Sequence, residues 1–433
     1  SGAALQAGGA VQLFGGGLNN QNGQISAQSL WAELDGDINA DQSRITTQGS
    51  QVLLAAGSIN AQGARFTSAQ GDLVLDAQGR LTLIDTQLVA KQGVAHLYGT
   101  QGVSLAATNQ GTRTTTTTDL QQQTVEHAAV PAGPDSEGRA AYTEVISSTA
   151  TTTTRTATTW GESSVQADKI DIQSSQGAIT LSATDLKATN GTRLSAAQDV
   201  KLLAQRGIDN QSTTTTSANQ QQVRQGDDTV LALVSTTSAG PSSQQETLRT
   251  TTIDAGNGQL SIESKRGNIV GQSAQLAGDK VLLLTSKADP AKPGTGGGSI
   301  DLQSLQVAGK SVGMADAANG TSALVTQTVS TVQGSIKAAN GVTLSANQDI
   351  TLGAQAIDAG SGNLHAQAGG NLTLGANADF EQRNQSSNRT SSSLFTRTTT
   401  TGTYQAQEGK AAVTTLQGAD ISLQAGDTLT NYA

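Results

Sequence analysis

Apolar residues recur along this chain with a regular period. Ile38, Ile59, Leu81 and Val103 follow one another at spacings of 21, 22 and 22, and each of the first three follows a glycine and one further residue. A fixed period of about 20 to 50 residues indicates a solenoid or a similar array of stacked units. The pattern therefore predicts one long repeat array.

The same period returns in three later parts of the chain. At a spacing of 21, Ile179/Leu181 correspond to Val200/Leu202 and Leu260/Ile262 correspond to Val281/Leu283, and at a spacing of 22, Val342/Ile350 correspond to Leu364/Leu372. The repeated unit thus extends over most of the sequence.

Each repeat has an inner rhythm that is typical of short strands. Apolar residues lie two positions apart, as in Val342 with Leu344, and a Gly, Asn or Asp follows within a few residues. A further apolar residue lies seven positions after a marker: Ile45 after Ile38, Phe66 after Ile59, Leu88 after Leu81, Leu186 after Ile179 and Ile357 after Ile350. These offsets predict a coil with three sides.

The sequence thus predicts an all-β fold, a right-handed parallel β-helix, with the hand taken from the right-handedness of parallel connections. One coil points about five or six small aliphatic side chains inward, at roughly 1.5–3 kcal/mol each, while ordering its backbone costs roughly 1–2 kcal/mol per residue. A single coil therefore cannot fold alone. Stability must come from neighbouring coils stacked about 4.8 Å apart.

Four stretches rich in threonine or serine interrupt the period, at residues 112–160, 211–252, 320–333 and 384–404. Threonine favours strands, but a strand made only of threonine has no buried side. Two-stranded hairpins that leave the rod and return to it would keep threonine in strands without requiring a buried side. Three interruptions follow Leu105, Ile208 and Phe380, each placed on the third side of a coil, so the hairpins would leave from one edge and pair into a second, flatter sheet. Disordered loops are the alternative, because this composition also suits disorder.

The predicted organisation alternates coils with extensions. Coils occupy residues 1–111, 161–210, 253–319, 334–383 and 405–433, and Ser/Thr-rich β-hairpin extensions occupy 112–160, 211–252, 320–333 and 384–404. The coil segments correspond to about 15 coils and a rod of roughly 70 Å.

Composition narrows the classes of function. The 433 residues carry 25 Lys and Arg against 34 Asp and Glu, a net charge of −9, and only 2% are aromatic, so nucleic acid binding is not expected. The chain has no cysteine, which excludes disulfides, thiolate nucleophiles and cysteine-ligated metals. Its apolar runs, such as Val281–Leu284, fall far below the ~20 residues of a spanning helix. The start at Ser1 shows no secretory signal, and we expect an internal part of a longer chain.

One motif has the form of a catalytic nucleophile. Gly309-Lys310-Ser311-Val312-Gly313 matches G-x-S-x-G, and Asp349 and His365 follow in the order of an α/β-hydrolase. That motif requires a strand leading into a helix, whereas here it lies in a Gly-rich β-region, so a chance match is expected. A P-loop around Lys310 fails because Ser304 stands where glycine is required. We therefore expect no catalytic residues and no enzymatic activity.

The sequence signals for metal binding and for sugar binding are equally weak. His96, His127 and His365 lack metal-ligand spacing, and Asp35, Asp37 and Asp41 lack the register of a calcium loop. No metal or other cofactor is expected. A polysaccharide-acting β-helix would place paired acids on a solvent face. It would also need aromatic platforms, and the only tryptophans are Trp31 and Trp160, with core or rim packing of Trp31 at least as favoured as a binding role.

Several phrases of the sequence resemble the haemagglutinin repeats of filamentous haemagglutinin and of the effector proteins of contact-dependent growth inhibition. The resemblance rests on residues 18–27 (LNNQNGQISA), 177–183 (GAITLSA), 341–352 (GVTLSANQDITL) and 370–376 (GNLTLGA). The Ser/Thr-rich breaks at 211–252 and 384–404 resemble the second, more C-terminal repeat region of those effectors. The part of the chain that precedes the first break is more similar to the regular first region.

The resemblance implies a secreted protein of the bacterial surface. Such proteins leave the cell through an outer-membrane secretion pore partner, and either act as adhesins or carry a C-terminal toxin to a neighbouring bacterium. It also implies a target-cell outer membrane or receptor as a partner, a toxin domain in the same polypeptide, and a periplasmic stage before delivery. Hydroxyl-rich hairpins nevertheless lack the apolar outward face of a transmembrane strand.

Three functions follow from these observations. The first is a structural and delivery module without enzymatic activity, the second is an adhesin shaft whose hairpins bind a receptor or glycan, and the third is a polysaccharide-acting enzyme. The period and the threonine-rich extensions favour the first.

Overall fold

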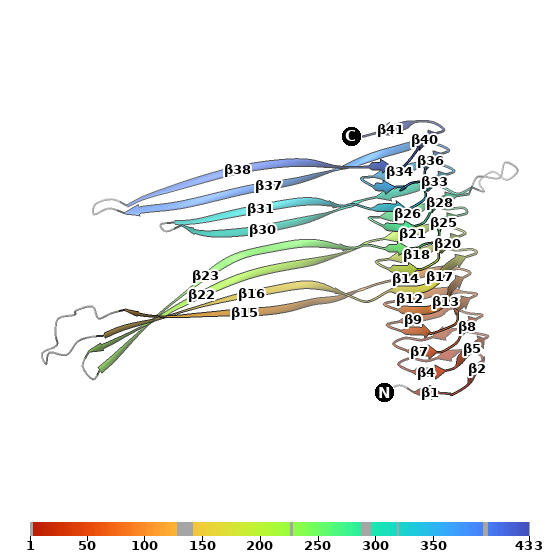
Figure 1. The fold of residues 1–433 in the computed structure, drawn as a ribbon, viewed down its shortest axis with the longest axis horizontal. Helices are drawn as coiled ribbons and strands as arrows, with labels where there is room; N and C mark the ends of the chain where they lie inside the picture. The colour runs from red at the N-terminus through yellow and green to blue at the C-terminus, as the bar shows by residue number, and fades with distance from the viewer. Residues whose placement is uncertain are drawn as a thin grey trace.

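The computed structural model describes residues 3–127, 142–225, 228–286, 296–317, 320–392 and 397–432, and within these ranges it contains strands and turns but no helix. It consists of a rod of stacked coils from which four long hairpins project on one side (Figure 1). Consecutive coils pair in parallel, so the rod is the predicted parallel β-helix.

Three parallel ladders run along the rod, and each coil contributes one strand to each ladder. The first ladder contains β1 (Ala4–Gln6), β4 (Gln24–Ala27), β7 (Arg44–Thr47), β10 (Arg65–Ser68), the first parts of β13 (Gln87–Gly99) and β17 (Ser164–Ser174), β19 (Asp185–Ala188), β24 (Thr252–Asp254), β27 (Gln275–Gly278), β32 (Ser335–Ala338), β35 (Ala356–Asp358) and β39 (Thr415–Gln417). The second contains β2 (Ala10–Gly15), β5 (Ser29–Leu34), β8 (Gln51–Ala55), β11 (Leu73–Ala77), the last parts of β13 and β17, β20 (Thr192–Ala196), β25 (Leu260–Ser264), β28 (Val281–Thr285), β33 (Val342–Ala346), β36 (Leu364–Ala368) and β40 (Ile421–Ala425). The third contains β3 (Leu18–Asn19), β6 (Ile38–Asn39), β9 (Ile59–Gln62), β12 (Arg80–Ile84), β14 (Gly102–Ala106), β18 (Ile179–Ser182), β21 (Val200–Leu203), β26 (Ile269–Gln272), β29 (Ile300–Gln303), β34 (Ile350–Gly353), the start of β37 (Leu372–Ser392) and β41 (Leu429–Asn431).

The marker residues of the sequence period stack directly above one another. Ile59 lies opposite Ile38 on one side and Leu81 on the other, and Leu81 lies opposite Val103. The stack continues in register through Ile179, Val200, Ile269, Ile300, Ile350 and Leu372. These side chains are buried in one continuous core, which confirms the predicted interior of small aliphatic residues.

The residues predicted seven positions further on form the first ladder. Phe66 lies between Ile45 and Leu88, and the same column contains Leu186 and Ile357. All are buried, and strands of the rod alternate buried and outward positions. The three-sided coil inferred from the offsets is therefore confirmed.

Polar turn residues join each coil to the next. Asp37 Oδ1 accepts a hydrogen bond from the backbone N–H of Ser58 at 2.7 Å, Asp41 Oδ1 accepts from Gln62 at 2.9 Å, and Asp349 Oδ1 accepts from Asn371 at 2.7 Å. A carboxylate in this position satisfies a backbone donor where the chain turns between ladders.

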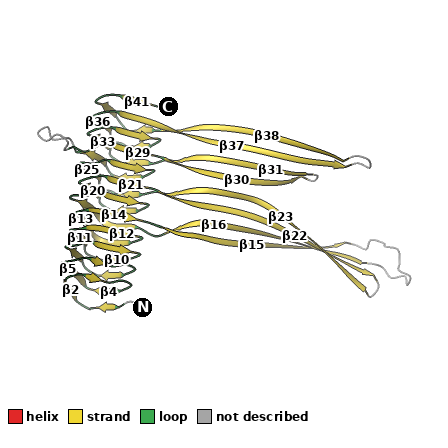
Figure 2. Ribbon diagram, turned by 180° about the vertical axis from the view of Figure 1, so that it is seen from behind, coloured by secondary structure: helices red, strands yellow, loops and turns green. Residues whose placement is uncertain are grey.

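The four hairpins form one antiparallel sheet beside the rod (Figure 2). They consist of β15 (Asn109–His127) with β16 (Tyr142–Trp160), β22 (Gln205–Gln225) with β23 (Asp228–Arg249), β30 (Leu305–Ala317) with β31 (Gly320–Val332), and β37 beyond Gly375 with β38 (Arg397–Val413). Neighbouring hairpins pair through β16 with β22, β23 with β30, and β31 with β37. We call this eight-stranded array the hairpin sheet. It is the second sheet that the sequence predicts beside the rod, and the alternative of disordered loops does not hold for its described strands.

Several predicted boundaries are wrong. The third extension begins at Leu305 rather than at residue 320, so Leu305–Ala317 does not belong to the coils assigned to 253–319. The fourth runs from Ala376 to Val413, well beyond 384–404. Ile208 and Phe380 lie inside hairpin strands and not on the third side of a coil.

The rod is also shorter than predicted. Each ladder contains twelve strands in the part of the chain that the structure describes, against about 15 expected coils. Twelve coils are separated by eleven intervals of about 4.8 Å each, so the rod is about 53 Å long. The excess arose because hairpin strands with few threonines, such as β30, have a composition similar to that of the coils.

Candidate interaction surface on the hairpin sheet

All four hairpins leave the rod at the same corner. Each is inserted after a strand of the third ladder (β14, β21, β29 or the start of β37) and before a strand of the first (β17, β24, β32 or β39). Because the two ends of every insertion meet at one corner, the rod keeps its register across them. The corner therefore aligns the hairpins into one sheet.

Buried hydroxyl groups line this corner, which we call the exit corner. Thr184 Oγ1 donates to the carbonyl oxygens of Leu105 and Ser182 at 3.1 and 3.2 Å, and Thr251 Oγ1 lies within 3.2 Å of those of Leu181 and Leu203. Thr86, Ser163 and Thr414 hold equivalent places immediately before β13, β17 and β39. Several of these carbonyls, such as those of Ser182 and Leu203, already accept a backbone N–H, so the hydroxyls add a second hydrogen bond to them.

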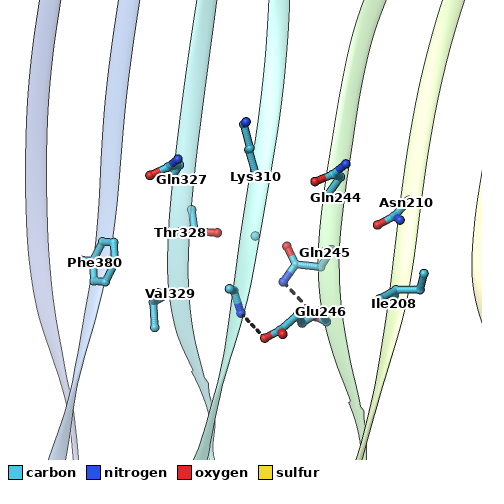
Figure 3. Close-up of a pocket in the computed structure, with 12 residues that line it drawn as sticks. Ile208, Asn210, Gln244, Gln245, Glu246, Lys310, Gln327, Thr328, Val329 and Phe380 are labelled. Carbon is cyan, nitrogen blue, oxygen red and sulfur yellow. Dashed lines mark hydrogen bonds between the residues drawn. The ribbon is translucent and has the colours of Figure 1, made fainter.

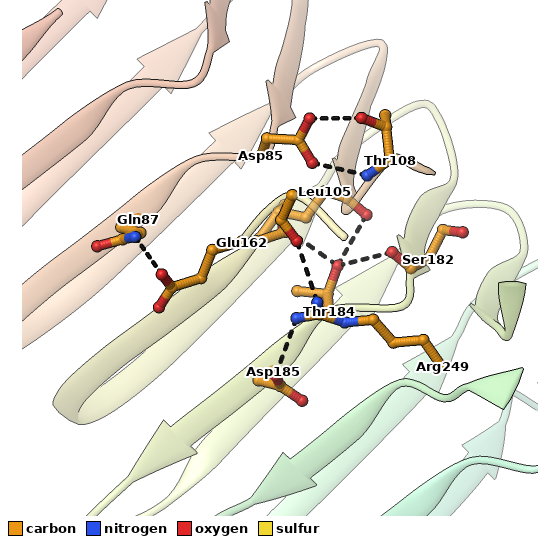
Figure 4. A network of polar contacts seen from close by, with 11 residues as sticks. Asp85, Gln87, Leu105, Thr108, Glu162, Ser182, Thr184, Asp185 and Arg249 are labelled. Carbon is orange, nitrogen blue, oxygen red and sulfur yellow. Dashed lines mark hydrogen bonds and ion pairs between the residues drawn. The ribbon is translucent and has the colours of Figure 1, made fainter. Parts of the chain in front are cut away.

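Charged side chains fix the roots of the first two hairpins above the corner (Figure 4). The Asp85 carboxylate accepts from the backbone N–H of Thr108 at 2.6 Å, from the hydroxyl of the same residue, and from Gln110 Nε2 at 2.7 Å. Arg249 donates to the Gly161 carbonyl at 3.1 Å and pairs with Asp185 at 3.4 Å. The end of the second hairpin is thus tied to the end of the first.

Replacing Thr184 by valine is expected to lower the free energy of unfolding by about 1–2 kcal/mol, because the buried hydroxyl's hydrogen bonds to the Leu105 and Ser182 carbonyls are lost while the volume is kept. Thr180→Val, on the outward side of β18 just before Thr184, is the matched control and should change stability by less than about 0.5 kcal/mol. Urea unfolding followed by circular dichroism measures both. Equal effects of the two substitutions would contradict the role given to the exit corner.

Side-chain pairs join the two strands of the first hairpin to each other and join that hairpin to the second. Thr114, Thr116 and Thr118 of β15 hydrogen-bond across to Thr156, Thr154 and Thr152 of β16 at 3.0–3.5 Å. Arg155 of β16 donates from Nε to Asp209 of β22 at 2.7 Å, and this hydrogen bond lowers the pKa of the Asp209 carboxyl. Cross-strand hydroxyl pairs give the threonine runs the partners that a single strand lacks.

A groove of about 480 Å³ crosses the base of the hairpin sheet where the second and third hairpins meet (Figure 3). Asn210, Gln244, Lys310 and Gln327 lie opposite one another on successive strands and form a polar row. The row continues on β37 and β38 with Gln382 and Gln407. Amide groups offer both donors and acceptors, so the row presents alternating partners to a polar ligand.

A more apolar row lies beside it, nearer the rod. Val329 of β31 lies opposite Phe380 of β37, and Ile208 and Phe380 are 38% and 37% exposed. Between them, Glu246 accepts from the backbone N–H of Ala308 at 2.9 Å and from Arg206 at 3.1 Å. The groove therefore combines an apolar strip with an amide row, which suits binding of an extended polar ligand. No sequence signal indicates this site, because its strands are brought together only by the exit corner.

The structure separates the residues of the hydrolase-like motif. Ser311 lies in β30 between Ser243 and Thr326, Asp349 lies in a turn of the rod, and His365 lies in β36 opposite Thr343 and Ser422. Ser311 is in the middle of a strand and not at a turn into a helix.

Among the side chains that the structure describes, His96, His365 and the acidic patch do not form a common site. His96, on the outward face of β13, lies 3.6 Å from Asp171, while the side chain of His127 is outside the described set. Asp37 and Asp41 bind backbone N–H groups of the next coil. The side chains that the structure describes include no group of three or more His, Asp or Glu that could hold a metal ion.

The two tryptophans have different surroundings. Trp31 is on the outward face of β5, 41% exposed, with Nε1 donating to Glu33 at 3.4 Å. A side chain on Gly207 would lie 2.9 Å from the Trp160 ring, so this glycine lets Trp160 pack against the root of the second hairpin. Trp31 is thus on the rod surface, where the sequence left core, rim and binding roles open.

The fold and the hairpin sheet define a class, a β-solenoid that carries its interaction surface on lateral hairpins. Residues 144–288 match the model of the hemagglutinin repeat family, and this part of the chain is a filamentous haemagglutinin-type repeat region. The match contains β16, the second hairpin and the coils around them, so the family unit includes both coil and hairpin. Searches of curated proteins and of solved structures gave no match.

The family match agrees with the resemblance seen in the sequence. Hemagglutinin repeats belong to secreted, surface-associated exoproteins whose context is two-partner secretion with an outer-membrane partner, and they support an adhesin-like role. Among the described residues, no helix is long and apolar enough to cross a membrane.

Proposed function

We propose that this chain is the structural and delivery repeat region of a two-partner-secretion exoprotein, without enzymatic activity. The rod holds the hairpin sheet at a fixed place along a long polypeptide and supports presentation or translocation of a C-terminal toxin into a neighbouring bacterium. The observation that carries the proposal is the exit corner, because four hairpins spread along the chain from Asn109 to Val413 leave the rod there in one register. A spacer alone would need no such alignment.

Excising the second hairpin tests this function. Gln205 and Arg249 face each other at the root of that hairpin, so replacing residues 206–248 by a two-residue turn leaves the rod ladders continuous. In the full exoprotein, secretion and surface display are expected to persist while delivery of the C-terminal domain falls by at least about tenfold. A matched control replaces the distal halves of the strands, residues 216–237, and keeps the groove. Undiminished delivery after the full excision would overturn the proposal.

An adhesin shaft is the second candidate, and the groove at the base of the hairpin sheet favours it. Phe380 and Lys310 offer an exposed ring and a cation beside the amide row. If the groove binds a surface receptor, Phe380→Ala with Lys310→Ala should reduce attachment of cells that display the protein by about tenfold or more. Phe14→Ala, which removes a 66% exposed ring from the rod, is the matched control. Equal attachment of both variants would rule the groove out.

A further inference from the structure

The hairpin sheet divides into two leaves between β23 and β30. These strands share only four residue pairs, from Ser242 with Val312 to Gln245 with Gly309, whereas β22 and β23 are paired along almost their whole length. Beyond this junction, β15, β16, β22 and β23 diverge from the other four strands (Figure 1). The inner edge of β23 is left open from Asp228 to Pro241 with respect to the described residues.

The division has a local cause in the sequence. Gly240 and Pro241 of β23 lie opposite the single residue Thr213 of β22, and a bulge of this kind bends its strand. Proline also has no N–H to donate to a neighbouring strand. Pairing with β30 therefore stops at Ser242.

The open edge of β23 differs from the two outer edges of the hairpin sheet. The outer strand β15 carries Arg113, Asp119 and Glu126, and the outer strand β38 carries Arg397, Glu408 and Lys410. Charges of this kind on an edge strand oppose pairing with other chains. From Thr229 to Gln245, β23 has no charged residue. Its edge is long, uncharged and without that protection.

The sequence of this edge is a palindrome. Residues Val230 to Val234 read Val-Leu-Ala-Leu-Val, and hydroxyl residues flank them as Thr229 and Ser235. Two such strands in an antiparallel pair with a two-fold axis at Ala232 would place Val230 opposite Val234 and Leu231 opposite Leu233. An isologous contact requires self-complementarity of this kind.

We propose that the open edge of β23 pairs with the same edge of a second copy of this chain. The two hairpin sheets then join into one continuous antiparallel sheet across a two-fold axis at Ala232, with the rods on opposite sides. Backbone hydrogen bonds supply the pairing, and the Val-Leu-Ala-Leu-Val palindrome fixes its register. This contact between copies is separate from toxin delivery and from the groove at the base of the hairpin sheet.

The absence of cysteine permits a direct test on the whole chain. Directly opposite residues of an antiparallel pair have Cα atoms about 4.5–5.5 Å apart, within the range that a disulfide spans. Ala232→Cys should therefore give a covalent dimer under mild oxidation, at least about tenfold faster than Ala239→Cys. Ala239 is an exposed residue of the same strand and would lie beyond the paired segment, which would end where Asp228 faces Thr236 of the other copy. Equal rates for the two variants would overturn the proposal.

Charge substitutions test the register without depending on oxidation. Leu231→Lys with Leu233→Lys sets like charges opposite each other twice and should weaken the dimer about 100-fold, as measured by analytical ultracentrifugation. Leu231→Lys with Leu233→Glu sets opposite charges together in the same register and should keep the affinity within about tenfold of the unchanged chain. Two results would contradict the pairing. One is a chain without substitutions that is still monomeric at about 100 µM. The other is equal affinities for the two double variants. A monomer would leave the edge to a strand of another protein.

Discussion

Replacing Ile179 by aspartate is expected to cost at least about 4 kcal/mol and to unfold the coils on both sides of the first hairpin. Ile179 has no exposed surface and lies between Val103 and Val200 in the third ladder. A carboxylate there has no partner among aliphatic side chains, so it must either be buried unpaired or take up a proton. In a solenoid each coil is stabilised by its neighbours, and the damage therefore spreads along the rod.

Guanidinium unfolding followed by circular dichroism checks this result, with proteolysis to locate the unfolded coils. Thr180→Asp is the matched control, because Thr180 is adjacent, faces outward and lies between Ser104 and Lys201. We expect that control to change stability by less than about 1 kcal/mol. If the two substitutions were equally harmful, the interior would not be the continuous core described above.

The rod could be predicted from the sequence because every coil repeats the same packing of apolar side chains against its neighbours. Each coil must bury the same few side chains above the previous ones, so Ile38, Ile59 and Leu81 had to recur at the length of one circuit. The signal survives the insertions, since both ends of a hairpin return to one corner. The predicted column through Ile179 and Val200 is therefore correct although a hairpin separates it from Val103.

The hairpin strands were only partly predictable, because threonine marks some of them and not others. The runs at Thr114 and Thr151 identify the first hairpin, whereas Leu305 and Val307 of β30 lie two positions apart, as the apolar residues of coil strands do. The groove was not predictable at all. Lys310 meets Gln244 through pairing between two different hairpins, and nothing near either residue in the sequence indicates that partner.

The exit corner was also invisible in the sequence, for a related reason. Thr184 and Thr251 are single hydroxyl residues among many, and each is distinguished only by the carbonyls it reaches in other coils. A close backbone contact between neighbouring coils, in contrast, does have a signal in the sequence. Asp-Ala-Gly-x-Gly occurs at Asp254–Gly258 and again at Asp358–Gly362, and both copies form the same turn.

Replacing Gly258 by valine is expected to lower the free energy of unfolding by about 3 kcal/mol. A Cβ at this position would lie 2.2 Å from the carbonyl carbon of Asn190 and 2.4 Å from the nitrogen of Gly191, both in the coil below. The obstacle is backbone and not a flexible side chain, so the coils must separate to make room. Gly362 lies equally close to Asn340 and predicts the same loss.

The control for this prediction is Gly8→Val, because a Cβ on Gly8 meets nothing within 4 Å. Both substitutions remove the same freedom from the unfolded chain, so the difference between them reports the close approach of the coils alone. Urea unfolding of Gly258→Val, Gly362→Val and Gly8→Val gives that difference. Because a side chain at position 258 fits only if the two coils move apart, a Gly258→Val protein as stable as Gly8→Val would mean that the coils are not stacked at the described spacing. The column of aliphatic side chains from Ile38 to Leu372 would then lose its geometric basis as well.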